Sequence, residues 1–73
     1  MKTNIEKVFE IFENHRERFE NTMNAGLSYI AFGYLLACQA LLTAVDIFEP
    51  DAVEVEQMAG AQDAMQHWFF GKE

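Results

Sequence analysis

Few residues in this sequence have side chains that could do chemistry: one cysteine, Cys38, and two histidines, His15 and His67. A catalytic cysteine needs a neighbouring base or cation that lowers its pKa, and the sequence around Cys38 holds no Lys, Arg or His. We therefore predict that Cys38 is a buried and inert thiol. Because a serine nucleophile with a plausible base and a glycine-rich phosphate loop are also missing, we predict that the protein is not an enzyme.

The two histidines do not predict a metal site. Asp63 and His67 are four residues apart and share a helix face, but two ligands do not define a site, so a local pair is expected. Phe12 and Ala64 stand three residues before the two histidines, so the Glu-x-x-His pattern of helical di-metal sites is missing. His15 lies on an apolar stripe, which indicates the border of a helix interface. We expect neither a metal nor any other cofactor.

Five glutamates near the N-terminus recur at spacings of four, three, four and three, which places them on one face of a helix. This acidic ridge, about 21 Å long by helix geometry, consists of Glu6, Glu10, Glu13, Glu17 and Glu20. One interpretation is a solvated face that keeps an apolar protein soluble. The other is an anionic surface that binds a partner protein through a basic groove, such as one that normally holds nucleic acid.

Consecutive aromatic residues near the C-terminus form a second candidate binding surface. The run is His67-Trp68-Phe69-Phe70, and consecutive aromatic side chains cannot all face one core. At least one of Trp68 and Phe70 should therefore project away from the core. An outward aromatic side chain indicates a dimer contact or a partner hot spot, because Trp and other aromatics concentrate binding energy. We include Trp68 and Phe70 with the acidic ridge as candidate partner-binding residues.

The composition restricts the classes of partner. A formal charge of −7 over 73 residues argues against direct nucleic-acid binding, which needs clustered Lys and Arg, and against an anionic membrane surface. Apolar residues make up 51% of the chain, more than so short a monomer can bury. Without a disulfide or zinc site, oligomerisation is the remaining way to stabilise it, so we predict a homodimer. The lack of a signal segment and the single cysteine predict a cytoplasmic protein.

Helical periodicity runs through the whole sequence, and no strand signals are present. Thr3 and Glu6 fit a capping box, Pro50 suits a first helical position, and Gly71 is a natural helix stop. The expected fold is all-α, a helical hairpin plus a third helix, completed as an intertwined or side-by-side homodimer. Residues 1–73 form one domain with helices at about 3–24, 27–48 and 50–70.

The break between the first two helices is open to a second interpretation. Asn24-Ala25-Gly26 looks like a helix end, but the apolar stripe stays in phase straight through it. One continuous helix from Thr3 to Phe48 would be about 70 Å long and would need a partner chain to cover it.

Residues 25–45 carry no charge and are long enough to cross a bilayer. Gln39 near the centre, acidic flanks and the lack of basic anchors favour a core helix of a soluble protein over a membrane span. The residues that we expect in a dimer core are Leu27, Ile30, Tyr34, Leu35, Cys38, Leu41, Leu42 and Val45.

The sequence thus predicts a small, acidic, non-enzymatic protein that binds another protein as an adaptor or inhibitor. Proteins of this type are common among phage and mobile-element accessory factors that block a host enzyme, here one that handles nucleic acid. The alternative is a small membrane protein with a single span at residues 25–45. The predicted partners are a second copy of the chain and another protein, not nucleic acid.

Overall fold

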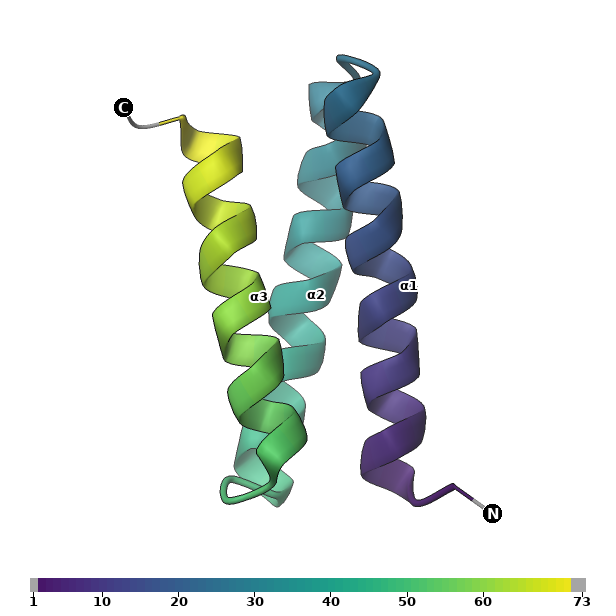
Figure 1. Cartoon of the computed structure of the whole chain (residues 1–73), viewed down its shortest axis with the longest axis vertical. Coiled ribbons are helices and arrows are strands. Elements are labelled where there is room, and N and C mark those ends of the chain that lie inside the picture. Colours follow the sequence, from purple (N-terminus) through teal and green to yellow (C-terminus); the bar gives the residue numbers. More distant parts are fainter. Residues whose placement is uncertain (1, 72–73) are drawn as a thin grey trace.

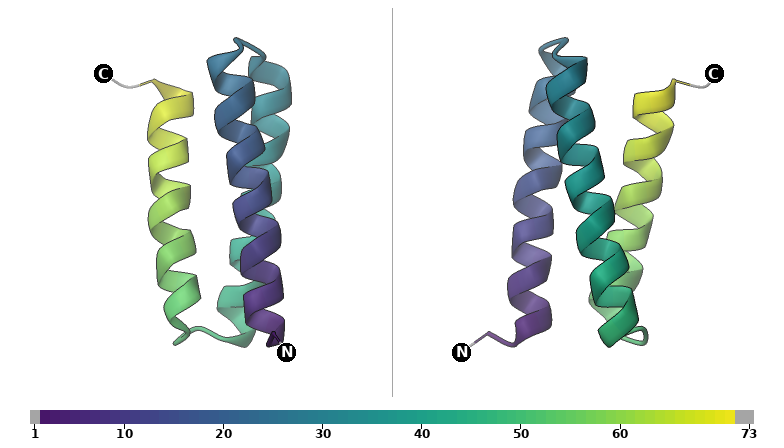
Figure 2. Two further views of the ribbon diagram at one scale, coloured as in Figure 1. Left: turned by 45° about the vertical axis from the view of Figure 1, so that its right-hand side comes forward. Right: turned by 180° about the vertical axis from the view of Figure 1, so that it is seen from behind.

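The computed structural model describes residues 2–71, which form three helices. These are α1 (Asn4–Asn24), α2 (Ser28–Phe48) and α3 (Val53–Phe70). α1 and α2 form an antiparallel hairpin, and α3 returns along the other side of α2 (Figure 1). Seen from behind, α2 lies in front of α1 and α3 and between them (Figure 2). The predicted all-α fold of a hairpin plus a third helix is confirmed.

The start of α1 is fixed by side chains of its own first turn. Thr3 Oγ1 accepts a hydrogen bond from the Glu6 backbone N–H at 3.3 Å, and the Glu6 carboxylate accepts one from the Thr3 N–H at 2.9 Å. Two backbone donors that the helix leaves unpaired are thereby satisfied, which is the predicted capping box.

The chain reverses direction between α1 and α2 at a glycine. Gly26 adopts a left-handed conformation with φ of +77°, which a residue with a Cβ reaches only with strain. Its N–H donates to Met23 O at 3.1 Å, and the Leu27 N–H donates to Thr22 O at 2.8 Å. This pair of bonds is a Schellman motif that ends α1. The continuous helix from Thr3 to Phe48 is therefore wrong, although the apolar residues keep their helical phase across the break.

The turn between α2 and α3 differs from the sequence prediction. Pro50 was expected at the first position of the third helix, but α3 begins at Val53. The Ala52 N–H donates to Glu49 O at 3.1 Å, so Glu49–Ala52 is a four-residue turn with Pro50 second. Proline is as well suited to that turn position as to a helix start, because both need φ near −65°. At the other end, Gly71 ends α3 in the left-handed conformation, as predicted.

The core lies where the three helices meet. Its buried members are large side chains of α1 and α3 packed around small ones and one leucine of α2, namely Phe12, Phe19, Ala31, Leu35, Cys38, Met58 and Met65. Gln62 is buried among them, and its side-chain amide donates to Leu35 O at 3.4 Å. The Cα atoms span 36 × 25 × 14 Å, so the molecule is thin in one direction and leaves many apolar side chains outside this core.

Candidate protein-binding surfaces

Aromatic rings gather where the C-terminus of α3 meets the start of α2. The Phe69 ring stacks on Phe32 with centroids 5.3 Å apart, and the Phe70 ring meets it edge-on at 5.2 Å. Trp68 packs edge-on against buried Phe19 at 5.7 Å. Phe32, Trp68, Phe69 and Phe70 are here called the aromatic end. Phe69 anchors this group to the core, while the other three side chains are exposed.

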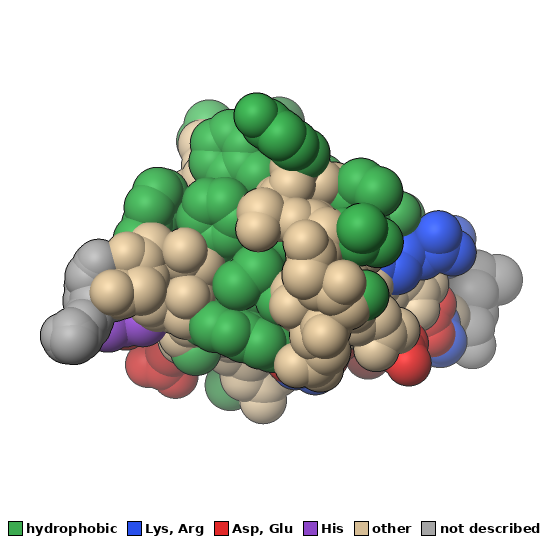
Figure 3. All heavy atoms as spheres, turned by 90° about the horizontal axis from the view of Figure 1, so that it is seen from above, with side chains coloured by type: hydrophobic (Ala, Val, Ile, Leu, Met, Phe, Trp, Pro, Cys, Tyr) green, Lys and Arg blue, Asp and Glu red, His purple; other side chains and the backbone are tan. Residues whose placement is uncertain are grey.

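The aromatic end has a hollow that could receive a side chain of a partner. A shallow pocket of about 360 Å³ is lined by Phe32, Phe69 and Phe70 together with Ser28 and Tyr29. Figure 3 looks onto this end of the molecule and shows hydrophobic side chains over much of it, with acidic side chains at the margin. The sequence predicted an outward aromatic side chain at Trp68 or Phe70, and both are exposed, with 58% of Phe70 accessible. Phe32 was missed because the charge-free helix that carries it has no polar face to orient it.

The outward side of α2 is a second uncharged surface. Its exposed residues recur every three or four positions along the helix, which defines the α2 outer face: Tyr29, Gly33, Leu36, Ala40, Thr43, Ala44 and Ile47. Tyr29 is 97% exposed, so its ring makes almost no contact within the chain. By length and composition, α2 could cross a membrane, alone among the helices of residues 2–71, and 22% of its most apolar stretch is buried.

Most residues predicted to form a dimer core face the interior of the single chain. Leu35, Cys38 and Val45 are buried, and three more side chains pack half-buried against the core: Tyr34, Leu41 and Leu42. Leu27 and Ile30 are exposed. Packing against α1 and α3 therefore already covers the stripe of α2 that was assigned to a partner copy, and a second copy would meet a different side of this helix.

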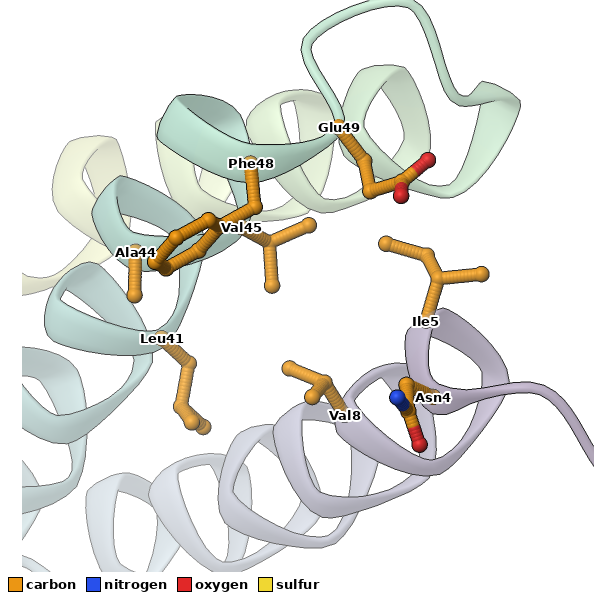
Figure 4. Close-up of a pocket in the computed structure, with 8 residues that line it drawn as sticks. All are labelled: Asn4, Ile5, Val8, Leu41, Ala44, Val45, Phe48 and Glu49. Atoms are coloured by element: carbon orange, nitrogen blue, oxygen red, sulfur yellow. The ribbon is translucent and has the colours of Figure 1, made fainter.

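An apolar groove lies between the start of α1 and the end of α2, with a volume of about 520 Å³. Ile5 and Val8 of α1 face Leu41 and Val45 of α2 across it (Figure 4). Further lining comes from Asn4, Ala44, Phe48 and Glu49. Ala44 also belongs to the α2 outer face, so the groove and that face form one continuous apolar surface.

The acidic ridge is partly neutralised by basic side chains of the same helix. Arg16 donates to Glu13 at 2.5 Å and to Glu20 at 2.7 Å, and the hydrogen bond that it donates to Glu13 is the main cause of the raised pKa of Arg16. Lys2 pairs with Glu10. The Glu6 carboxylate takes part in the capping box. Among residues 2–71, Glu17 is the only glutamate of the acidic ridge with neither an ion pair nor a side-chain hydrogen bond. Arg16 can pair with both glutamates because Glu13 stands three residues before it and Glu20 four residues after it, on the same helix face.

The thiol and the imidazoles occupy structural positions. Cys38 Sγ donates to Phe12 O at 3.7 Å, and burial raises the pKa of this thiol to about 11. His15 Nδ1 lies 2.8 Å from Ile11 O, with its ring edge-on to Tyr34. His67 and Asp63 form an exposed pair at 3.9 Å. Within the described part of the chain, no group of three or more His, Cys, Asp or Glu side chains could hold a metal ion.

Comparison with protein-family models, with curated proteins and with solved structures finds no match for this chain. We therefore infer a function from the surfaces of the chain itself. Of these, the aromatic end gathers the most exposed aromatic side chains in one place, and the α2 outer face exposes Tyr29 and Ile47.

Proposed function

We propose that this chain is a non-enzymatic protein-binding protein, an adaptor or inhibitor, which acts in the cytoplasm and contacts its partner protein mainly through the aromatic end. The observation that supports this most directly is the cluster of Phe32, Trp68 and Phe70 around an anchored Phe69. Rigid aromatic side chains bury a large area at little entropic cost, and such residues concentrate binding energy in interfaces. The shallow pocket between them fits an apolar side chain of the partner.

The charge of the chain adds a preference for a basic partner. The formal charge is −7, and the acidic ridge retains more carboxylates than its two basic partners neutralise. The electrostatic field of this negative surface accelerates association with a basic surface, such as the nucleic-acid-binding groove of a host enzyme. In this proposal the ridge steers the encounter and the aromatic end holds the complex. An accessory protein that blocks such an enzyme is the biological role that we propose.

Affinity capture from the native host, followed by titration of the purified partner, tests the aromatic end. Trp68→Ala and Phe70→Ala should each weaken binding by at least about tenfold, which corresponds to about 1.4 kcal/mol. Ile11→Ala is the matched control, because Ile11 is an exposed apolar residue of α1 away from the aromatic end. Equal affinities for all three variants and the parent would contradict the assignment.

A second candidate function is supported by the apolar and largely exposed α2. A helix of this length and composition could lie in a bilayer, with α1 and α3 at its sides. Flotation of the purified chain with zwitterionic lipid vesicles distinguishes the two functions. The protein-binding proposal requires that the chain stays at the bottom of the gradient and is soluble without detergent.

A further inference from the structure

We propose that the α2 outer face binds a second copy of this chain in an antiparallel arrangement, with the two α2 helices aligned over their full length. This surface adjoins the aromatic end at Tyr29, which also lines the shallow pocket there, but the inference is argued from the properties of α2 and does not depend on the proposed function. The occupant is inferred from three properties of the face: its area, its symmetry and its charge.

The exposed apolar area around α2 supplies a large part of what a stable dimer buries. Tyr29 of this face is 97% exposed, which at about 200 Å² for an aromatic side chain leaves roughly 190 Å² uncovered, and Phe48, 80% exposed in the adjoining groove, adds about 160 Å². A standard interface buries about 800 Å² on each partner, which is about a sixth of the 4913 Å² of this chain. Leu36 and Ile47, with the small residues between them, supply further area along the same helix.

The face is also symmetric about the middle of the helix. α2 runs from Ser28 to Phe48, so its midpoint is position 38. An antiparallel pair centred there places Leu36 opposite Ala40 of the second copy, Tyr29 opposite Ile47 and Gly33 opposite Thr43. Large side chains thus meet smaller ones. A parallel pair would instead place each residue opposite itself, so that Leu36 meets Leu36 and Gly33 meets Gly33, without this pairing of large side chains with smaller ones.

Charge selects the same orientation. The C-terminal end of α2 carries Asp46, and the turn that follows it carries Glu49 and Asp51. A parallel pair would bring these carboxylates together with those of the second copy, which is repulsive. An antiparallel pair brings each set to the N-terminal end of the other α2, where the helix dipole is positive and the first turn has no acidic residue.

Gly33 is explained by such an arrangement. Glycine destabilises the middle of a helix relative to alanine, yet a Cβ at Gly33 would meet nothing within 4 Å inside this chain. The packing of the single chain therefore does not require glycine there. A second helix packed along this face would favour it, because Thr43 of the second copy would lie opposite Gly33. Gly60 of α3 is equally unhindered but stands between polar residues, with Gln57 and Asp63 three positions to either side, so it serves as a control.

The first experiment measures the mass of the unmutated chain in solution. Sedimentation equilibrium at tens of micromolar should give twice the chain mass of 8.4 kDa. Leu36→Gln and Gly33→Leu should each weaken the dimer at least tenfold while circular dichroism retains the helical signal. Leu36 is 53% exposed, so a polar side chain fits the monomer there, and Ile11→Gln at 45% exposure and Gly60→Leu are the matched controls. A folded monomer for the parent, or equal loss in the controls, would overturn the proposal.

The second experiment determines the orientation by disulfide cross-linking. A mixture of Tyr29→Cys and Ile47→Cys chains should form a cross-linked dimer, whereas neither variant alone should do so. Native Cys38 does not compete, because it is buried inside the monomer. Efficient cross-linking of Tyr29→Cys chains to one another would refute the antiparallel pairing. A chain that enters lipid vesicles through α2 would overturn the proposal in favour of a lipid occupant.

Discussion

Replacing the buried amide of Gln62 with a methionine is predicted to stabilise the fold. Gln62 is 3% exposed, and its Oε1 has no hydrogen-bond partner among residues 2–71. An unsatisfied buried acceptor destabilises a protein by about 1–3 kcal/mol. The one bond that the side chain makes, from its amide nitrogen to Leu35 O, is long at 3.4 Å, so its loss should cost only about 0.5 kcal/mol.

The net gain expected for Gln62→Met is therefore about 1 kcal/mol. Leu35 O lies within α2 and keeps the helical donor four residues further on, so the substitution leaves no new buried acceptor unpaired. Methionine matches glutamine closely in size and helix propensity, and Met58 and Met65 of the same helix already pack in this core.

Urea denaturation at one fixed protein concentration measures this effect, since the stability of a dimer depends on concentration. The midpoint should rise with an unchanged slope, and the melting temperature should increase by about 4–8 °C for each kcal/mol. Gln57→Met is the matched control, because Gln57 is an exposed glutamine of the same helix and should change stability by less than about 0.5 kcal/mol. A destabilised Gln62→Met with an unchanged control would show that Oε1 is satisfied and refute the reasoning.

Three further predictions concern a turn, a thiol and the acidic ridge. Gly26→Ala should lower the free energy of unfolding by about 1 kcal/mol, because alanine is strained at the left-handed φ of this position, although nothing crowds a Cβ there. An unchanged midpoint in urea denaturation would contradict this. Cys38 has a pKa raised by burial to about 11 from an ordinary value near 9, so stability should fall as the pH rises through this range. A thiol reagent at pH 8 should label the native chain far more slowly than the urea-unfolded chain, and equal rates would be evidence against burial. Changing Glu10, Glu13 and Glu17 together to Gln should slow association with a basic partner and reduce its salt dependence, while the free energy of unfolding in urea changes by less than about 0.5 kcal/mol. Unchanged association rates would leave the ridge as a solubility device.

Features that depend on local interactions were predictable from the sequence. The capping box at Thr3 and Glu6 and the stop at Gly71 each involve residues a few positions apart, and the structure confirms both. Pro50 shows the limit of such reasoning, because one fixed φ suits both a helix start and a turn. The turn was selected by the path from α2 to α3, which the sequence near Pro50 does not encode.

The orientation of α2 could not be predicted for a different reason. In an amphipathic helix such as α1, the contrast between an apolar and a polar face shows which side is buried. α2 carries no charge from Ser28 to Val45 and lacks this contrast. Its predicted dimer-core residues were assigned to contact with a second copy, whereas the structure uses two of them, Leu35 and Cys38, for packing within the chain. The position of α3 decides which side of α2 remains exposed, and that position depends on contacts between residues far apart in the sequence.

The up-and-down connection of neighbouring helices has a kinetic consequence. α1 contacts α2 through a turn of three residues, and α2 contacts α3 through a turn of four, so most contacts join segments that are close in the chain. Topologies of this kind fold in microseconds to milliseconds, because little loop-closure entropy is lost before contacts form. Monomer refolding should therefore finish before two copies meet at micromolar concentration. Refolding followed by stopped-flow fluorescence of Trp68 should then show a fast phase independent of concentration and a slower one that accelerates with it.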